Sequence, residues 1–179
     1  MTTKHQFSKL DFYVPTWNLK YLFLGTFNPD YSEEVRYYYG RTRNQFWKLL
    51  RSVFNEDFDP NKPGFFDLLV KHGIGCIDMI HSVTSDSNIT GNADSILFKK
   101  KATRKYNTQK INDLIKRNSN LKIYSTWGNG PKLNEWCKEL KKIDKEFISL
   151  KSPSMAARVP AGTNKFNYML ENWSNKIKI

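Results

Sequence analysis

The chain has 179 residues, 39% hydrophobic and 15% aromatic, and its 29 Lys and Arg against 17 Asp and Glu give a formal charge of +12. This length suits one compact domain spanning residues 1–179, and the apolar content excludes global disorder. No apolar run approaches the roughly 20 residues of a membrane helix, and two cysteines are too few for a disulfide scaffold, a four-cysteine zinc site or an iron–sulfur cluster.

In the first half of the chain, short apolar runs alternate with helical spacing and polar loops. A buried strand ended by glycine is followed by a long loop that contains three adjacent tyrosines. The predicted elements are a strand over 20–25, a loop over 26–40, a helix over 44–54, a helix over 63–72 that ends at Gly73, a strand over 75–80 and a polar loop over 82–92.

The second half continues the alternation and carries the whole excess of positive charge. Residues 1–90 hold 10 basic and 10 acidic side chains, whereas residues 91–179 hold 19 and 7. Two interpretations of this charge stay open: solvated lysines on an ordinary surface, or a face that binds the phosphates of a polyanion. The densest basic run comprises Lys99, Lys100, Lys101, Arg104, Lys105 and Lys110. The predicted elements are a helix over 107–118, a strand over 121–127, a helix over 132–142, a strand over 146–150, a loop over 151–162 and a last helix that carries Phe166, Met169, Leu170 and Trp173.

This order of elements predicts an α/β fold with three layers, α/β/α, around a short, mostly parallel four-stranded sheet. Sheets of this kind bind ligands at the carboxyl ends of their strands. The loops over 26–40, after Ile80 and over 151–162 leave predicted strands and should open at that edge.

Several kinds of active site are excluded by the absence of their motifs. The sequence has no glycine-rich phosphate loop, no dinucleotide-binding fingerprint and no His-Glu-x-x-His pair. The three histidines, His5, His72 and His81, are scattered, and we expect each of them on the surface or in a loop rather than at a metal ion.

Four motifs lie in order at the ends of the predicted strands: G-T-F-N-P at 25–29, Y-Y-G-R-T-R-N-Q-F-W-K-L-L at 38–50, G-I-G-C-I-D at 73–78 and S-P-S-M-A-A at 152–157. Alone, the first and last are compatible with ordinary turns. Together they resemble the uracil-DNA glycosylase superfamily, most closely its mismatch-specific uracil and thymine glycosylases and its hypoxanthine-DNA glycosylases. The resemblance extends from residue 20 to residue 162.

The resemblance implies a monofunctional DNA glycosylase of base excision repair. Such an enzyme flips a deaminated base (uracil, hypoxanthine or a related base) out of DNA and hydrolyses its N-glycosidic bond without a metal or another cofactor. Its partner would be DNA that contains a damaged base. We also expect a monomeric, cytoplasmic protein of prokaryotic origin, not bound to a membrane and in a reducing compartment.

The resemblance also implies roles for individual residues. Asn28 falls where the family positions its water. Asn44 has two interpretations, a catalytic one from the hypoxanthine branch and a structural one as a helix cap. The candidate base-binding residues are Phe27 through nearby backbone N–H groups, Asp30, Tyr39 through stacking, and Asp78, for which a structural role is an equal alternative. The candidate DNA-binding residues are Ser152 and Ser154 at the phosphates, Met155 as a wedge and Arg158 at a phosphate or the orphaned base.

Two positions depart from the family pattern. Ser152 stands where the best-known uracil glycosylases have a histidine that stabilises the departing uracil anion, and Asp30 replaces a glycine that is common after Asn-Pro. The departures point to a slower or differently selective enzyme, and a non-catalytic nucleic-acid-binding module on the same scaffold is the alternative. An unrelated small-molecule hydrolase would explain neither the charge nor the adjacent tyrosines.

Overall fold

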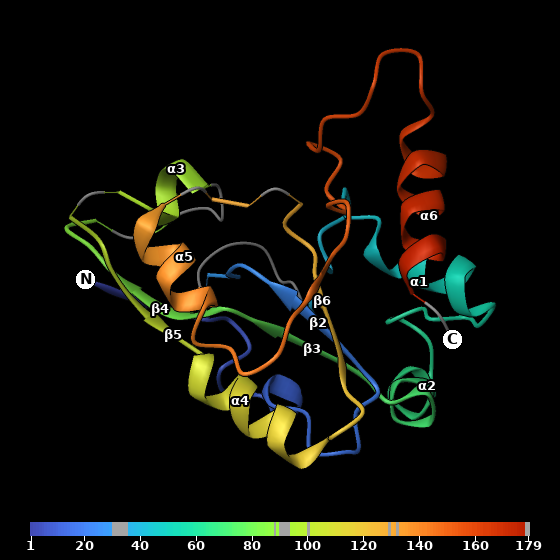
Figure 1. Ribbon diagram of the computed structural model, residues 1–179, viewed down its shortest axis with the longest axis horizontal. Helices are drawn as coiled ribbons and strands as arrows, with labels where there is room; N and C mark the ends of the chain where they lie inside the picture. The colour runs from blue at the N-terminus through green and yellow to red at the C-terminus, as the bar shows by residue number, and fades with distance from the viewer. Residues whose placement is uncertain are drawn as a thin grey trace.

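The structure is a computed structural model that describes residues 1–29, 36–87, 89, 94–99, 101–128, 130–131 and 133–177. Figure 1 shows the arrangement of its helices and strands. In chain order the elements are β1 (Thr2–Lys4), the 3-10 helix η1 (Asp11–Tyr13), β2 (Tyr21–Gly25), α1 (Phe46–Phe54), α2 (Phe65–His72), β3 (Ile74–Asp78), β4 (Ile80–Thr84), α3 (Asp94–Leu97), β5 (Thr103–Tyr106), α4 (Thr108–Arg117), β6 (Lys122–Ser125), α5 (Asn134–Leu140), β7 (Ile148–Ser149) and α6 (Lys165–Lys176).

The central sheet has four parallel strands in the order β3-β2-β6-β7. All residues of β2 and β3 are buried, as expected for strands covered on both faces. These strands coincide with the four predicted ones to within a few residues at their ends. The α/β prediction with a four-stranded parallel sheet is therefore confirmed.

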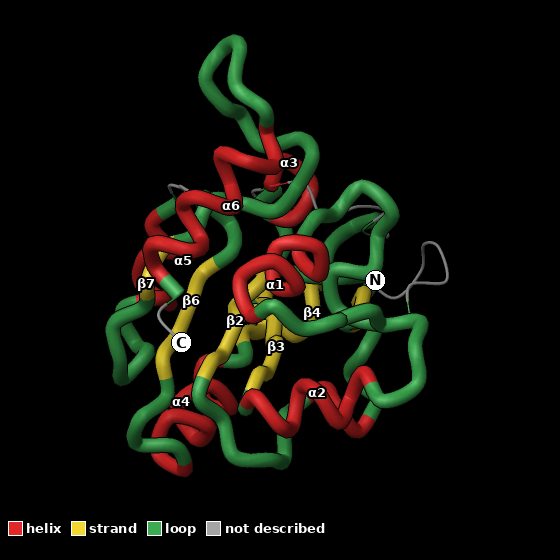
Figure 2. Tube along the Cα trace, turned by 90° about the vertical axis from the view of Figure 1, so that its right-hand side faces the viewer, coloured by secondary structure: helices red, strands yellow, loops and turns green. Residues whose placement is uncertain are grey.

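Helices cover both faces of this sheet (Figures 1 and 2). Side chains alternate along β2, so Tyr21 and Phe23 enter one hydrophobic cluster and Leu22 and Leu24 enter the other. The first cluster includes buried residues of α1, α2 and α6, and the second includes residues of α4 and α5. The three-layer arrangement is the predicted one.

A second, antiparallel sheet was not predicted. Its strand order is β1-β4-β5, with β4 pairing to both neighbours. Residues 82–84, predicted as part of a polar loop, belong to β4, so that prediction is wrong. Only two of the five residues of β4 are buried, and β1 and β5 are mostly polar, so the hydrophobic alternation that marks a strand is weak here.

The helix boundaries have identifiable causes. The Asn44 side chain accepts a hydrogen bond from the Phe46 N–H at 2.9 Å, at the start of α1. Helix α2 ends at Gly73, whose φ of 64° is left-handed and whose N–H donates to the Leu69 and Val70 carbonyls. Among the described residues, no helix has the length and apolar character that a bilayer span would need.

Candidate functional site

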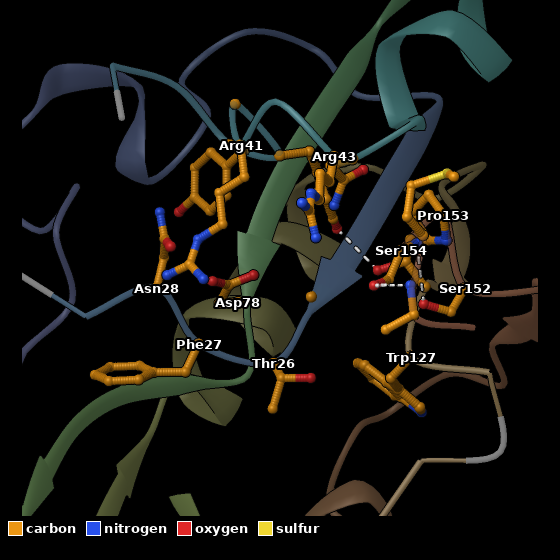
Figure 3. Close-up of a pocket in the computed structure, with 18 of the residues that line it drawn as sticks. Thr26, Phe27, Asn28, Arg41, Arg43, Asp78, Trp127, Ser152, Pro153 and Ser154 are labelled. Atoms are coloured by element: carbon orange, nitrogen blue, oxygen red, sulfur yellow. Dashed lines mark hydrogen bonds between the residues drawn. The ribbon is translucent and has the colours of Figure 1, made fainter. Parts of the chain in front are cut away.

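A pocket of about 710 Å³ lies at the carboxyl ends of the central strands (Figure 3). Residues 25–28 follow β2, Asp78 ends β3, residues 126–127 follow β6 and residues 152–156 follow β7. Residues 38–44, which precede α1, complete the lining. This is the edge at which the sequence predicts a ligand, because loops that leave parallel strands gather there.

Most of the predicted site residues meet in this pocket. Arg158 is not part of the lining and is an exposed residue of the loop after β7. Asp30 lies outside the described residues. The described residues of the loop predicted after Ile80, 81–87 and 89, are not in the pocket lining, since the chain there continues into β4. The predicted residues that line the pocket are Phe27, Asn28, Tyr39, Asn44, Asp78, Ser152, Ser154 and Met155.

Asn28 is held by the N-terminal segment. Its Nδ2 donates to Gln6 Oε1 at 3.1 Å, and the Gln6 N–H donates to the Asn28 carbonyl at 2.8 Å. The side-chain amide is therefore oriented, and within the described residues its Oδ1 accepts no hydrogen bond. Phe27 lines the pocket but its ring is buried, and Figure 3 shows that ring pointing away from Asp78 and Arg41.

Asp78 is buried and paired with a histidine. His5 Nε2 lies 2.7 Å from Asp78 Oδ2, and His5 Nδ1 accepts the Phe7 N–H at 3.2 Å. Because Nδ1 is an acceptor, the proton of a neutral ring is on Nε2, which donates to the carboxylate. His5 is fully buried, so a surface position is wrong, although the residue lies between β1 and η1, outside the named helices and strands. The polar stretch around residue 5 gave no signal of this burial.

Tyr39 has one face of its ring covered. The ring stacks on Phe46 with centroids 3.8 Å apart and planes at 8°. Its hydroxyl donates to Thr126 Oγ1 at 3.0 Å, because Thr126 uses its own proton on the Leu24 carbonyl. Burial raises the pKa of Tyr39 well above its ordinary value, so the phenol stays neutral.

Tyr38 also lines the pocket, whereas Tyr37 packs against Phe65. Burial likewise raises the pKa of Tyr38 well above its ordinary value. Within the described residues, the buried Tyr38 hydroxyl has no hydrogen-bond partner. Tyr38 is buried in the first hydrophobic cluster, and Tyr37 and Tyr39 are partly buried and pack against that cluster.

The loop before α1 and the loop after β7 pair with each other. Asn44 and Ser154 form an antiparallel bridge, the Gln45 N–H donates to the Pro153 carbonyl at 3.0 Å, and the Met155 N–H donates to the Arg43 carbonyl at 3.3 Å. Asn44 accepts the Phe46 N–H, whereas the N-cap residue of α1 is Gln45, so the structural and the catalytic interpretation of Asn44 both stay predictions.

Serine hydroxyls shape the loop after β7. Ser152 Oγ accepts the Ser154 N–H, and Ser154 Oγ accepts the Ala156 N–H at 3.2 Å. Met155 is 45% exposed, and its sulfur accepts from Gln45 Nε2. The loop thus presents a long apolar side chain at the mouth of the pocket.

Several lining residues were not singled out from the sequence. Arg41 and Arg43 lie within the quoted motif at 38–50, and Figure 3 shows the Arg41 guanidinium pointing toward Asp78, on the side of Asn28. Thr126 and Trp127 follow the third central strand, so the rule that places ligands at strand carboxyl ends could have found them.

The basic run of the second half is only partly available to a phosphate. Arg104, with a side chain 8% exposed, donates to both Glu135 oxygens and to the Leu97 carbonyl. Lys110 Nζ lies 4.6 Å from the centre of the Tyr13 ring. Lys99, Lys101 and Lys105 are exposed, and Lys100 lies outside the described residues. In the part of the chain that the structure describes, no group of three or more His, Cys, Asp or Glu side chains could hold a metal ion.

The fold is similar to that of a solved structure. The chain matches the solution NMR structure of a protein from Methanosarcina acetivorans, described as a putative uracil DNA glycosylase, with a TM-score of 0.58 and 22% identity over 90% of this chain and 93% of that chain. This chain has a uracil-DNA glycosylase-like fold. No protein-family model and no curated protein matches the sequence. Because one fold can carry many functions, the chemistry of the pocket residues determines the activity.

Proposed function

We propose that the chain is a monofunctional DNA glycosylase that hydrolyses the N-glycosidic bond of a deaminated base flipped out of DNA. The observation that carries this proposal is the convergence of Asn28, Tyr39 and Asp78, from three separate segments, in one pocket at the carboxyl edge of a uracil-DNA glycosylase-like fold.

Breaking the glycosidic bond makes the sugar electron-poor and the departing base electron-rich. A water must therefore be held at the sugar, and hydrogen-bond donors are needed at the base. Asn28 suits the first task, since Gln6 holds its amide nitrogen and leaves Oδ1 to accept a bond from water. An amide is too weak a base to remove a proton near neutral pH, so Asn28 would orient the water without deprotonating it.

Tyr39 would stack on the flipped base with the ring face that Phe46 leaves open. Stacking of a base on an aromatic ring is worth about 1–3 kcal/mol. The pair is rigid because the Tyr39 hydroxyl is bound to Thr126. Asp78 would contact the edge of the same base, together with backbone N–H groups near Phe27.

The loop after β7 would hold the DNA. Ser152 and Ser154 would contact the backbone phosphates, and Met155 would fill the gap left by the flipped base. Arg158, exposed on the same loop, would contact a phosphate or the orphaned base. Pairing of this loop with residues 43–45 fixes it relative to Asn44 and the pocket.

We also propose that residues 1–179 act as one domain. His5 and Gln6 come from the N-terminal segment, yet they bind Asp78 and Asn28 of the central sheet and its first loop. Removal of that segment would take away the side-chain partner that it provides to each of the two pocket residues.

Base release tests the proposal. Oligonucleotides carrying uracil, hypoxanthine, xanthine or mismatched thymine, as single strands and duplexes, would be treated with alkali to reveal abasic sites. We expect release of at least one base, loss of that release in Asn28→Ala with DNA binding retained, and normal release in the exposed control Asn120→Ala. Normal turnover by Asn28→Ala would show that Asn28 does not orient the attacking water.

The alternative is a non-catalytic nucleic-acid-binding module on the same scaffold. Ser152 at the position of the family's histidine is the observation that favours it. Salt-dependent binding of DNA with no release of any base would support this function and contradict the glycosylase.

A further inference from the structure

Asp78 and Arg41, which come from different segments, line the pocket, and the fully buried His5 is the hydrogen-bond partner of Asp78. We propose that they recognise the edge of the base. Asp78 accepts a ring N–H, Arg41 donates to the neighbouring carbonyl, and His5 is a positioning residue that acts through Asp78. The inference rests on the proposed function and names its substrate class, which is bases that present a ring N–H beside a carbonyl.

His5 fixes which atoms of Asp78 face the pocket. The ring is fully buried, with the Phe7 N–H on Nδ1 and Asp78 Oδ2 on Nε2, and it packs at 5.0 Å from the Tyr13 ring and 5.6 Å from the Tyr38 ring. These contacts therefore fix the orientation of the imidazole ring. With Oδ2 engaged by the Nε2–H, Oδ1 is the oxygen left for a ligand.

Oδ1 lies beside the stacking ring. A Cβ added to Gly25 would lie 2.0 Å from Asp78 Oδ1 and 3.1 Å from the Tyr39 hydroxyl oxygen, so both atoms flank the backbone of Gly25. A base stacked on Tyr39 would thus have its edge turned to an acceptor that is already oriented.

Arg41 supplies the donor. Its guanidinium points toward Asp78 on the side of Asn28 (Figure 3) and lines the same pocket. A guanidinium has five N–H groups, so Arg41 can donate to a ligand in addition to the contacts that it makes within the protein. An acceptor next to a donor complements a base edge with N–H next to C=O.

Deamination creates that edge. In cytosine the ring N3 is an acceptor beside an amino donor, and in uracil it is an N–H beside a carbonyl. Adenine and hypoxanthine differ in the same way at N1 and position 6. The pocket therefore matches uracil and hypoxanthine and opposes their parent bases, cytosine and adenine, whose donors and acceptors are reversed.

The test measures binding to single-stranded oligonucleotides with a non-cleavable 2′-fluoroarabino sugar that carries uracil, 3-methyluracil or cytosine. We expect wild-type protein to bind uracil about tenfold or more tightly than either other base, because hydrogen bonds to charged groups are among the stronger ones. His5→Leu and Arg41→Leu should each lower uracil affinity several-fold.

The variants separate positioning from structure. His5→Leu should leave the affinity for 3-methyluracil unchanged, and His5→Gln, which keeps an N–H donor, should restore most of the uracil preference. His72→Leu, a histidine bound to Glu56, is the matched control. Thermal melting of each variant confirms that it is folded.

Two results would overturn the inference. One is an equal loss of both affinities in His5→Leu, which would mean that His5 only stabilises the fold. The other is equal wild-type binding of uracil and 3-methyluracil. A separate base-release assay tests the proposed function. If wild-type protein releases uracil, the proposed function holds even when one of these two results overturns the inference, and if it releases no base, the proposed function is wrong.

Discussion

Gly25 and Asp78 are partners in register at the carboxyl ends of β2 and β3, and the Asp78 carboxylate occupies the space that a side chain at residue 25 would need. Gly25→Ala should therefore displace the carboxylate from His5 and lower base release about tenfold or more, with a loss of about 1–3 kcal/mol in the free energy of unfolding. Base-release assays and urea unfolding measure the two effects.

A double variant isolates the clash. In an Asp78→Ala background the carboxylate is gone, so adding Gly25→Ala should cost much less unfolding free energy than it does in wild-type protein. Equal costs in the two backgrounds would show that Gly25 matters for a reason other than Asp78.

Two variants of Tyr39 should separate the contribution of its aromatic ring from that of its hydroxyl. Tyr39→Phe keeps the stack on Phe46 and loses the bond to Thr126, so release should fall only a few-fold. Tyr39→Leu removes the aromatic face, and a stacking contribution of about 1–3 kcal/mol corresponds to a fall of roughly 5- to 150-fold. Single-turnover rates of base release measure both effects. Similar rates for the two variants would exclude stacking of the base on Tyr39.

The central sheet and its helices could be predicted because their signals are local. The strand at Tyr21–Gly25 is apolar on both faces, and α1 shows its buried stripe in Phe46, Leu49 and Leu50. Both patterns follow from burial, and each can be recognised within the short stretch of sequence that forms the element. The second sheet differs, since β1 and β5 are mostly polar and are specified by pairing with β4.

The site was predictable to the extent that its residues lie in motifs. Asn28, Tyr39 and Asp78 stand at strand ends or in the quoted segments, and the structure brings them together. The partners that orient them, His5 and Gln6, lie far away in the chain, and nothing in a short polar stretch indicates which distant carboxylate or amide it will meet.

The ionisation of Glu135 should make the stability of the fold depend on pH. Hydrogen bonds from Arg104 and Tyr106 hold the pKa of this carboxyl below its usual range. A carboxylate with a lowered folded-state pKa stabilises the fold above its unfolded pKa, and this contribution is lost as the pH falls through the folded pKa. Glu135→Gln should therefore reduce stability at pH 7, by about 1 kcal/mol or less because the side chain is 46% exposed.

Urea unfolding between pH 3 and pH 7 checks this pH dependence. The stability difference between wild-type protein and Glu135→Gln should shrink toward the acid end, while the exposed control Glu146→Gln should show little difference at any pH. A gap that stays constant with pH would assign the effect to packing instead of ionisation.

Met155 should matter most where a base has to leave a duplex. Its side chain is 45% exposed at the mouth of the pocket, held through its backbone by Arg43, and is long enough to enter the gap left by a flipped base. A single strand has no partner base to replace, so a wedge contributes little there. Met155→Ala should therefore slow release from a duplex about tenfold, within the few kcal/mol that unstacking costs, and leave release from the single strand nearly unchanged. Single-turnover rates on the same lesion in both contexts measure the ratio, with Met155→Leu as the variant that keeps an apolar side chain of similar size. An equal loss on both substrates would mean that Met155 acts on the base inside the pocket and not as a wedge, and no loss on the duplex would mean that another residue of the loop is the wedge.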